Sequence, residues 1–87
     1  MIHSTWRTSN WFVRSDDEQI VMCYAIGDKA ASVIIRKGEA SALLQHNLLK
    51  RLKDFYQDWN INNPTFEADM NEGVKYVEDF AKAVGDV

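Results

Sequence analysis

Side chains that could carry out chemistry are few in this 87-residue chain. Nucleophilic catalysis needs a nucleophile beside a base, and the only imidazoles belong to His3 and His46. His3 stands near the start of the chain, and His46 is predicted on the solvent side of a helix. The single cysteine, Cys23, falls in a predicted central strand, where a thiol is more often a small buried hydrophobe than a reagent. The sequence therefore predicts a protein that is not an enzyme.

Residue sets that bind metals or nucleotides are not found either. A tetrahedral zinc site needs three or four converging ligands, which two histidines and one cysteine at these spacings do not supply. The four glycines stand too far apart to form a phosphate-binding loop. Neighbouring carboxylates, such as Asp16 and Asp17, point in different directions on a turn. We expect no metal, no cofactor and no small-molecule substrate.

Composition and charge narrow the class of protein. Hydrophobic residues make up 46% of the chain and charged residues 26%, as in an ordinary folded protein, and the length fits one domain over residues 1–87. The longest apolar run covers residues 20–26, whereas a membrane helix needs roughly 20 residues. A lone cysteine and the lack of a signal-like apolar start indicate a cytoplasmic protein. The net charge of −3 makes a nucleic-acid partner unlikely, because an excess of Lys and Arg drives such binding.

Residues 1–39 are predicted to form a three-stranded antiparallel β-meander. β-Branched and aromatic residues gather in three runs, at 11–14, 19–26 and 30–36, and an extension of the first run back to residues 5–6 is left open. The first turn falls at 16–18. Gly27-Asp28 supplies residues that tolerate positive φ in the second turn. In the run 19–26, apolar residues occupy both odd- and even-numbered positions, which indicates a central strand.

Residues 40–87 are predicted to form two amphipathic helices. The first ends near Asn60, and its apolar residues form one stripe: Leu44, Leu48, Leu52, Phe55 and Trp59, with Tyr56 and Leu49 at the edge of the stripe. The second begins after an Asn63 cap with Pro64 at the first helical position, and ends at Gly85. Gly73 lies in the stripe of this helix, where it could let a helix or the sheet approach closely. The predicted fold is therefore α+β, a meander followed by an αα-hairpin packed on one face (βββαα).

Register decides which face of the sheet the helices cover. If both turns have two-residue loops, the bulkier side chains share one face, and we assign that face to the helices: Trp11, Val13, Ile20, Met22, Tyr24, Ala31, Val33 and Ile35. The opposite face then carries apolar and aromatic side chains rimmed by arginine, a composition typical of protein-binding surfaces. The candidate partner-binding residues on it are Trp6, Phe12, Arg14, Val21, Ile34 and Arg36. A three-residue first loop would instead exchange Trp11 and Val13 for Phe12 and Arg14.

The sequence thus predicts a non-enzymatic module that docks on another protein, or on a second copy of itself as a homodimer. Its size favours this hypothesis, because the core of so short a chain supplies only roughly 3–5 kcal/mol and small domains often gain stability by association. The brevity of the chain and its lack of catalytic groups are in keeping with small inhibitor or accessory proteins of phages and other mobile elements.

Three alternatives stay open. Sheet aromatics and arginines could bind nucleic acid. The acidic face of the last helix could imitate a phosphate backbone, through Glu67, Glu72, Glu78 and Asp79. The N-terminal arm could also fold back over its own sheet, which would leave a monomer without a binding face.

Overall fold

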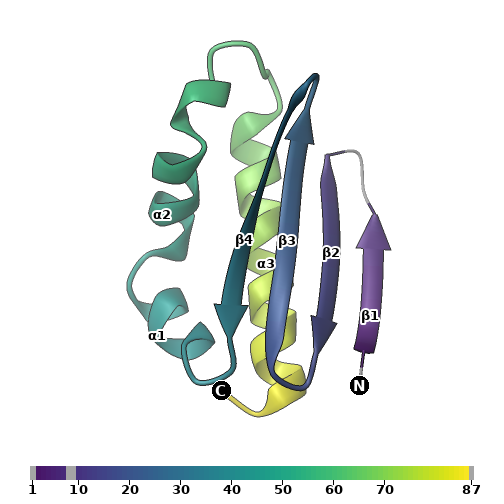
Figure 1. Ribbon diagram of the computed structural model, residues 1–87. Helices are drawn as coiled ribbons and strands as arrows, with labels where there is room; N and C mark the ends of the chain where they lie inside the picture. Colours follow the sequence, from purple (N-terminus) through teal and green to yellow (C-terminus); the bar gives the residue numbers. More distant parts are fainter. Residues whose placement is uncertain (1, 8–9, 87) are drawn as a thin grey trace.

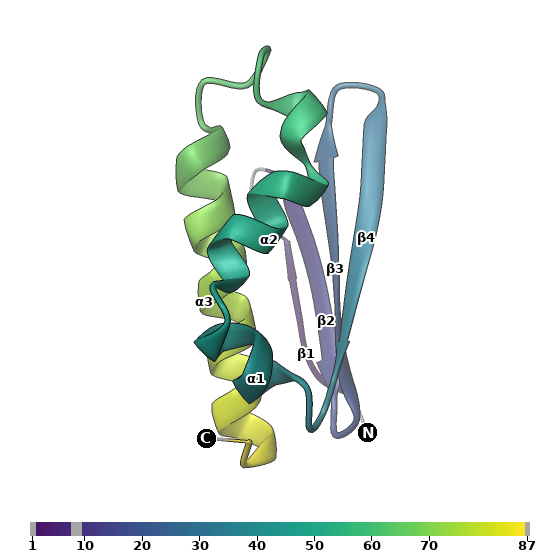
Figure 2. The same ribbon diagram turned by 90° about the vertical axis from the view of Figure 1, so that its left-hand side faces the viewer.

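Four strands and three α-helices make up the computed structural model, which describes residues 2–7 and 10–86. The elements are β1 (Ile2–Arg7), β2 (Trp11–Asp16), β3 (Gln19–Ile26), β4 (Lys29–Arg36), α1 (Ala40–Gln45), α2 (Leu48–Phe55), the 3-10 helix η1 (Gln57–Trp59) and α3 (Phe66–Val84). Figure 1 shows the antiparallel sheet in the order β1-β2-β3-β4. The described helices all lie on one side of it, as the turned view in Figure 2 makes clear. The predicted class, an α+β meander followed by helices on one face, is confirmed.

The sheet has one strand more than the sequence predicted. Residues 5–6 belong to β1, a separate strand that pairs with β2 from Ile2–Asp16 to Arg7–Phe12. An edge strand is held by hydrogen bonds along one side alone, so its sequence needs less of the β-branched and aromatic character that marks a central strand. Because β1 lies beside β2, the N-terminal segment extends the sheet and does not cross its face.

Two tight hairpins fix the register of the other strands. Ser15 pairs with Ile20 and Ile26 with Lys29, so both hairpins have the two-residue loop geometry on which the predicted faces depend. In the first hairpin, the Asp16 carboxylate accepts hydrogen bonds from the backbone N–H groups of Glu18, at 2.7 Å, and Gln19, at 3.0 Å. These bonds hold the pKa of Asp16 below its ordinary value of 3.8.

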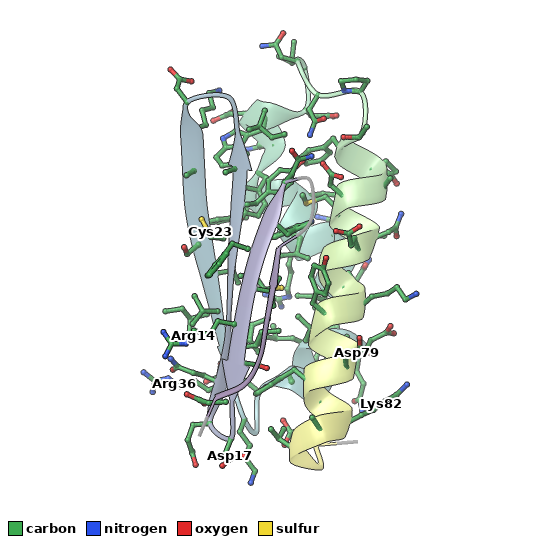
Figure 3. The ribbon with its side chains drawn as sticks, turned by 90° about the vertical axis from the view of Figure 1, so that its right-hand side faces the viewer. Arg14, Asp17, Cys23, Arg36, Asp79 and Lys82 are labelled. Atoms are coloured by element: carbon green, nitrogen blue, oxygen red, sulfur yellow. The ribbon has the colours of Figure 1, made fainter. Side chains whose placement is uncertain are left out.

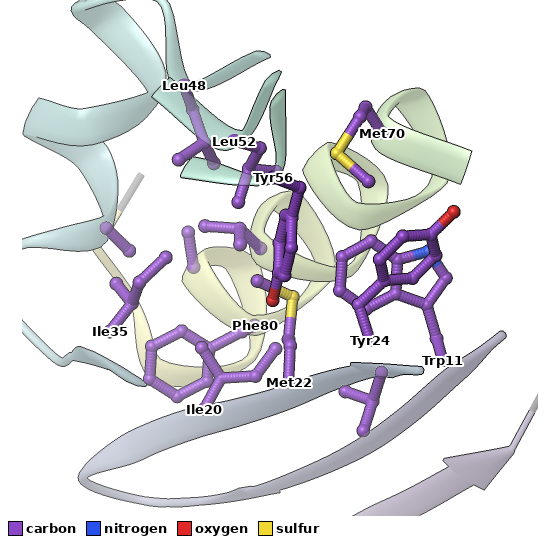
Figure 4. Close-up of a cluster of buried hydrophobic side chains, with 14 of the residues drawn as sticks. Trp11, Ile20, Met22, Tyr24, Ile35, Leu48, Leu52, Tyr56, Met70 and Phe80 are labelled. Carbon is purple, nitrogen blue, oxygen red and sulfur yellow. The ribbon is translucent and has the colours of Figure 1, made fainter. Parts of the chain in front are cut away.

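The core fills the space between the sheet and the helices (Figure 4). Aromatic rings form its centre, with ring centroids 4.6 Å apart for Trp11–Tyr24, 5.1 Å for Tyr24–Tyr56 and 5.4 Å for Tyr24–Trp59. A Cβ atom added to Gly73 would lie 2.9 Å from Cζ2 of Trp11 and 3.2 Å from Cδ1 of Leu52. The predicted close approach at Gly73 is confirmed, since both the sheet and α2 reach that point of α3.

The predicted first helix is divided into α1 and α2. Between them Asn47 adopts a left-handed conformation, with φ 61° and ψ 62°, and its Oδ1 accepts the backbone N–H of Lys50 at 3.3 Å. Tyr56, at the edge of the predicted stripe, is buried together with Leu48 and Leu52, whereas Phe55 is 57% exposed. The predicted single helix and the burial of Phe55 in one continuous stripe are therefore wrong.

α3 begins at Phe66, later than predicted, and Asn63 is not its cap. The Oδ1 atom of Asn63 accepts hydrogen bonds from the backbone N–H of Thr65, at 3.1 Å, and from its hydroxyl, at 2.9 Å. This turn directs the Asn63 amide inward, and the side chain is buried. The predicted end of the helix is confirmed, because Gly85 follows Val84 in the left-handed conformation, with φ 77°.

Candidate protein-binding surface

One side of the sheet faces away from all the described helices, and we give the name open face to eight of the described residues on it in β2, β3 and β4. They are Phe12, Arg14, Val21, Cys23, Ala25, Ser32, Ile34 and Arg36. The register aligns Phe12, Cys23 and Ser32 in one row across the three strands, and Arg14, Val21 and Ile34 in the next. Side chains paired in this way contact one another on the same face of a sheet.

Apolar side chains at the centre of the open face are accessible to solvent. Phe12 is 48% exposed and Ile34 is 57% exposed. Val21 and Cys23 are half-buried, because β3 has a neighbouring strand on each side. The result is a contiguous apolar patch that spans three strands, in contrast to the isolated apolar residues found on most protein surfaces.

Two arginines border this patch at the end of the sheet nearest the β2–β3 hairpin. Arg14 pairs with Val21, and Arg36 pairs with Gln19 at the start of β3. Figure 3 shows both arginines and Cys23 on the side of the sheet opposite α3. Arginine at the rim of an apolar patch can pair with carboxylates of a bound protein while the centre is desolvated.

The structure brings five of the six candidate binding residues onto one face: Phe12, Arg14, Val21, Ile34 and Arg36. Trp6, the sixth, belongs to β1 and pairs with Val13 in the backbone register, and its side chain lies outside the described part of the chain. The role of all six residues in binding stays a prediction.

The four candidate acidic residues of α3 lie far from the open face and in different surroundings. Glu67 forms an ion pair with Lys53 of α2, and Glu72 accepts a hydrogen bond from the Tyr76 hydroxyl at 2.7 Å. Glu78 and Asp79 are exposed, and Figure 3 shows Asp79 on the outer side of α3. Glu72, Glu78 and Asp79 line one surface hollow together with Lys75, and a role of the acidic residues in binding stays a prediction.

A buried polar cluster around Asp69, in the first turn of α3, was not predicted. Its Oδ2 accepts hydrogen bonds from the hydroxyl of Tyr24, from Asn10 at 2.7 Å and from Thr65 at 3.1 Å, although only 6% of Asp69 is exposed. The indole N–H of Trp11 donates to the Asp69 backbone oxygen at 2.9 Å. The helical pattern places Asp69 outside the apolar stripe, so periodicity gives no sign of its burial.

This cluster ties α3 to the sheet. Burial, and then the Asp69 carboxylate, raise the pKa of the Tyr24 hydroxyl far above its ordinary value of 10.0. Tyr24 has no exposed surface, so a substrate cannot reach its hydroxyl in this conformation. We therefore assign the Tyr24–Asp69 pair a role in positioning the helix.

A groove between β4 and α2 was also not predicted, because the sequence pattern placed Phe55 in the core. It has a volume of about 290 Å³ and is mostly apolar, with a lining of Ser32, Val33, Ile34, Ile35, Leu43, Leu48, Arg51, Leu52 and Phe55. The exposed side chains of Ile34 and Phe55 stand at its mouth. The groove and the open face meet at β4.

Within the described residues, no three His, Cys, Asp or Glu side chains are grouped closely enough to hold a metal ion. No helix in the same part of the chain has the length and apolar character needed to cross a membrane. No family model matches the chain, and neither a curated protein nor a solved structure matches it. The candidate surface therefore rests on the geometry and chemistry of the chain itself.

Proposed function

We propose that this protein is a non-enzymatic protein-binding module that works through the open face of its sheet, and that it pairs there with a second copy of itself. The observation that carries the proposal is the exposure of Phe12 and Ile34 on either side of the half-buried Val21. Water in contact with this patch is released when a partner covers it, which contributes about 25 cal/mol for each Å² of apolar surface.

The size of the open face sets the strength of association that we expect. Three strands about 4.8 Å apart, each up to eight residues long at about 3.3 Å per residue, cover roughly 350 Å² in plan. Stable interfaces bury about 800 Å² of accessible surface on each partner, so the open face is smaller than a standard interface. We therefore expect weak, reversible pairing, with a dissociation constant in the micromolar range or above.

A module of this kind acts by occupying a surface. An inhibitor or accessory role of the phage type, in the cytoplasm, is the form of activity that we favour. The lone thiol of Cys23 stands half-buried within the open face. In a reducing compartment this thiol stays free, so it can be covered by the partner as a small apolar group.

Size-exclusion chromatography with light scattering tests the pairing. At high micromolar concentration the wild-type chain should have a mass approaching twice 10.0 kDa. Phe12→Asp and Ile34→Glu place a charge in the open face and should each return the protein to a monomer. Ile61→Glu is the matched control, because Ile61 is 88% exposed and lies in the α2–α3 connection, outside the open face. A monomeric wild type, or equal behaviour of all three variants, contradicts the proposal.

Nucleic-acid binding is the second candidate, favoured by the presence of Arg14, Arg36 and Phe12 on one face. An exposed ring can stack on a base while guanidinium groups contact phosphates. Gel retardation of single- and double-stranded oligonucleotides at low salt tests it, since phosphate contacts are strongest there. Retardation that Arg14→Ala and Arg36→Ala weaken would support this candidate, and no retardation would exclude it.

A further inference from the structure

β4 is an edge strand of the sheet, with β3 as its one neighbouring strand among the described residues. β4 pairs with β3 from Lys29–Ile26 to Arg36–Gln19 without a bulge. A two-residue hairpin closes on a hydrogen-bonded pair, here Ile26–Lys29, and hydrogen-bonded pairs then recur at every second residue. The hydrogen bond from the Lys37 N–H to the Glu18 oxygen, at 2.7 Å, follows the same alternation. The odd-numbered residues of β4 therefore direct their backbone groups toward β3.

The even-numbered residues direct theirs outward. Among the described residues, nothing bonds to the outward N–H and C=O groups of Ala30, Ser32 and Ile34. Proteins usually protect such an edge with proline, a bulge or a charge in the middle of the strand. Residues 30–35 contain none of these. An unprotected edge of this length is a template for one more strand.

The groove gives this edge a second means of recognition. Leu48, Leu52 and Phe55 of α2 line its helix side, and Val33 and Ile35 line its sheet side. In a strand added beside β4, every second side chain would point toward the helices and enter the groove. Apolar side chains at those positions would cover Phe55, which is 57% exposed.

We propose that β4 and this groove bind one extended segment of a partner protein as a fifth strand, with apolar residues at alternate positions and carboxylates at its ends. The charge of the site argues for the carboxylates. Arg51 is the one charged residue among those described as lining the groove. Lys29 and Arg36 stand at the two ends of β4, and both are exposed. This inference concerns the sheet edge, and it holds whether or not the open face pairs with a second copy.

The position of α2 argues against a second copy at this edge. Figure 1 shows α2 beyond the outer edge of β4, and Figure 2 shows it on the helix side of the sheet. Next to the end of α2, the Tyr56 hydroxyl donates to the Ala31 backbone oxygen of β4 at 2.9 Å. Two β4 strands joined edge to edge would lie about 4.8 Å apart, so each α2 would project into the space of the other copy's helices. Packed helices need about 8–10 Å between their axes. A single strand without a covering helix avoids this clash.

A displayed library of random peptides of about ten residues, long enough to span β4, is the probe. Selection on the whole protein should enrich sequences with apolar residues at alternate positions, Asp or Glu toward the ends and no central proline. A synthetic peptide from this set should then bind in a fluorescence anisotropy titration. N-methylation of alternate backbone amides should weaken binding at least about tenfold in one register and little in the other. No enrichment, helical spacing of the apolar residues, or equal effects in both registers would overturn the proposal.

Variants of the protein locate the site. Ser32→Pro removes an outward N–H and leaves the β3–β4 hydrogen bonds in place, and Phe55→Glu places a charge in the groove at an exposed position. Each substitution should weaken binding of the peptide at least about tenfold. Phe55→Glu keeps the test valid if Ser32→Pro does not fold, which circular dichroism will reveal. Ile61→Glu and Phe12→Asp should bind the peptide like the wild type. Loss of binding in Phe12→Asp with none in Phe55→Glu would place the peptide on the open face and overturn the edge site.

Discussion

The two faces of the same sheet differ in what covers them. Trp11 is 1% exposed while its neighbour Phe12 is 48% exposed, and Ile35 is 2% exposed while Ile34 is 57% exposed. Both residues of each pair are apolar, so the difference comes from position, since successive side chains in a strand point to opposite faces. The helices cover one face, and the other keeps its apolar residues in contact with water.

Polar groups also differ between the covered face and the open face. On the covered side, every buried side-chain nitrogen or oxygen in the described residues has a hydrogen-bond partner, and Asp69 alone links β2, β3 and α3. On the open face, the charged groups are Arg14 and Arg36, and the polar Ser32 is exposed to solvent. We infer that the covered face supplies the stability of the fold and that the open face is left for binding.

The largest expected effect comes from replacing the neighbours Trp11 and Phe12 with alanine. Trp11→Ala should lower the free energy of unfolding by about 3–5 kcal/mol, because it leaves a cavity among Tyr24, Tyr56 and Gly73. Phe12→Ala should cost less than about 1 kcal/mol in the dilute monomer. Urea unfolding followed by circular dichroism measures both, and equal losses would break the distinction between the faces.

A smaller difference in the free energy of unfolding is expected between variants of Tyr24 and Cys23, which are neighbours in β3. Tyr24→Phe removes a hydroxyl that donates to the buried Asp69 carboxylate and accepts from Asn63, and it should cost about 1–3 kcal/mol. Cys23→Ala changes a half-buried side chain on the open face and should cost well under that amount. The same urea titration measures both free energies. A larger loss for Cys23→Ala would show that the open face carries stability after all.

Alkaline pH weakens the covered face through its buried tyrosines. Burial raises the pKa values of Tyr24 and Tyr56 in the folded protein above the 10.0 of an ordinary tyrosine. The unfolded chain therefore loses these protons first, so stability is intact below pH 10 and falls as the pH rises above it. Ultraviolet absorbance of tyrosinate, recorded together with circular dichroism, should show these ionisations coinciding with unfolding. Tyr24→Phe has one buried tyrosine fewer, so raising the pH from neutral should lower its free energy of unfolding less than it lowers that of the wild type. Ionisation of both tyrosines while the protein stays folded would contradict this account.

The smallest of these effects concerns the break that orients α2. Asn47→Ala removes the side chain that caps Lys50 and disfavours the left-handed backbone, so it should cost about 1–2 kcal/mol. Asn47→Gly keeps the backbone conformation accessible and should cost only a few tenths of a kcal/mol. Thermal unfolding ranks the two variants. If Asn47→Ala is as stable as the wild type, the left-handed turn and its cap do not stabilise the junction of α1 and α2.

The strand pattern predicts more of this molecule than the helix pattern does. Alternation of side chains and two-residue loops suffice to place Trp11 and Val13 on one face and Phe12 and Arg14 on the other. Helical periodicity places Leu48 and Leu52 in the core correctly, but it assumes one unbroken helix and fails at Asn47 and at the exposed Phe55.

The features that escaped prediction depend on contacts between segments distant in sequence. Asp69 is buried because Asn10, Tyr24 and Thr65 supply its hydrogen bonds, and no local pattern links these four positions. The groove beside β4 likewise forms only because α2, distant in sequence, packs beside the strand. The strand β1 gives a weak local signal because one neighbour, β2, pairs with it.

Accessibility of the open face as a function of protein concentration tests the central claim most directly. A soluble paramagnetic probe in an NMR titration reports the exposure of the Phe12 ring and of the methyl groups of Val21 and Ile34. We predict that all three become protected as the protein is concentrated, while Ile61 stays accessible. Unchanged accessibility of the open face at high micromolar concentration, or protection centred on Glu78 and Asp79 of α3, would contradict the account.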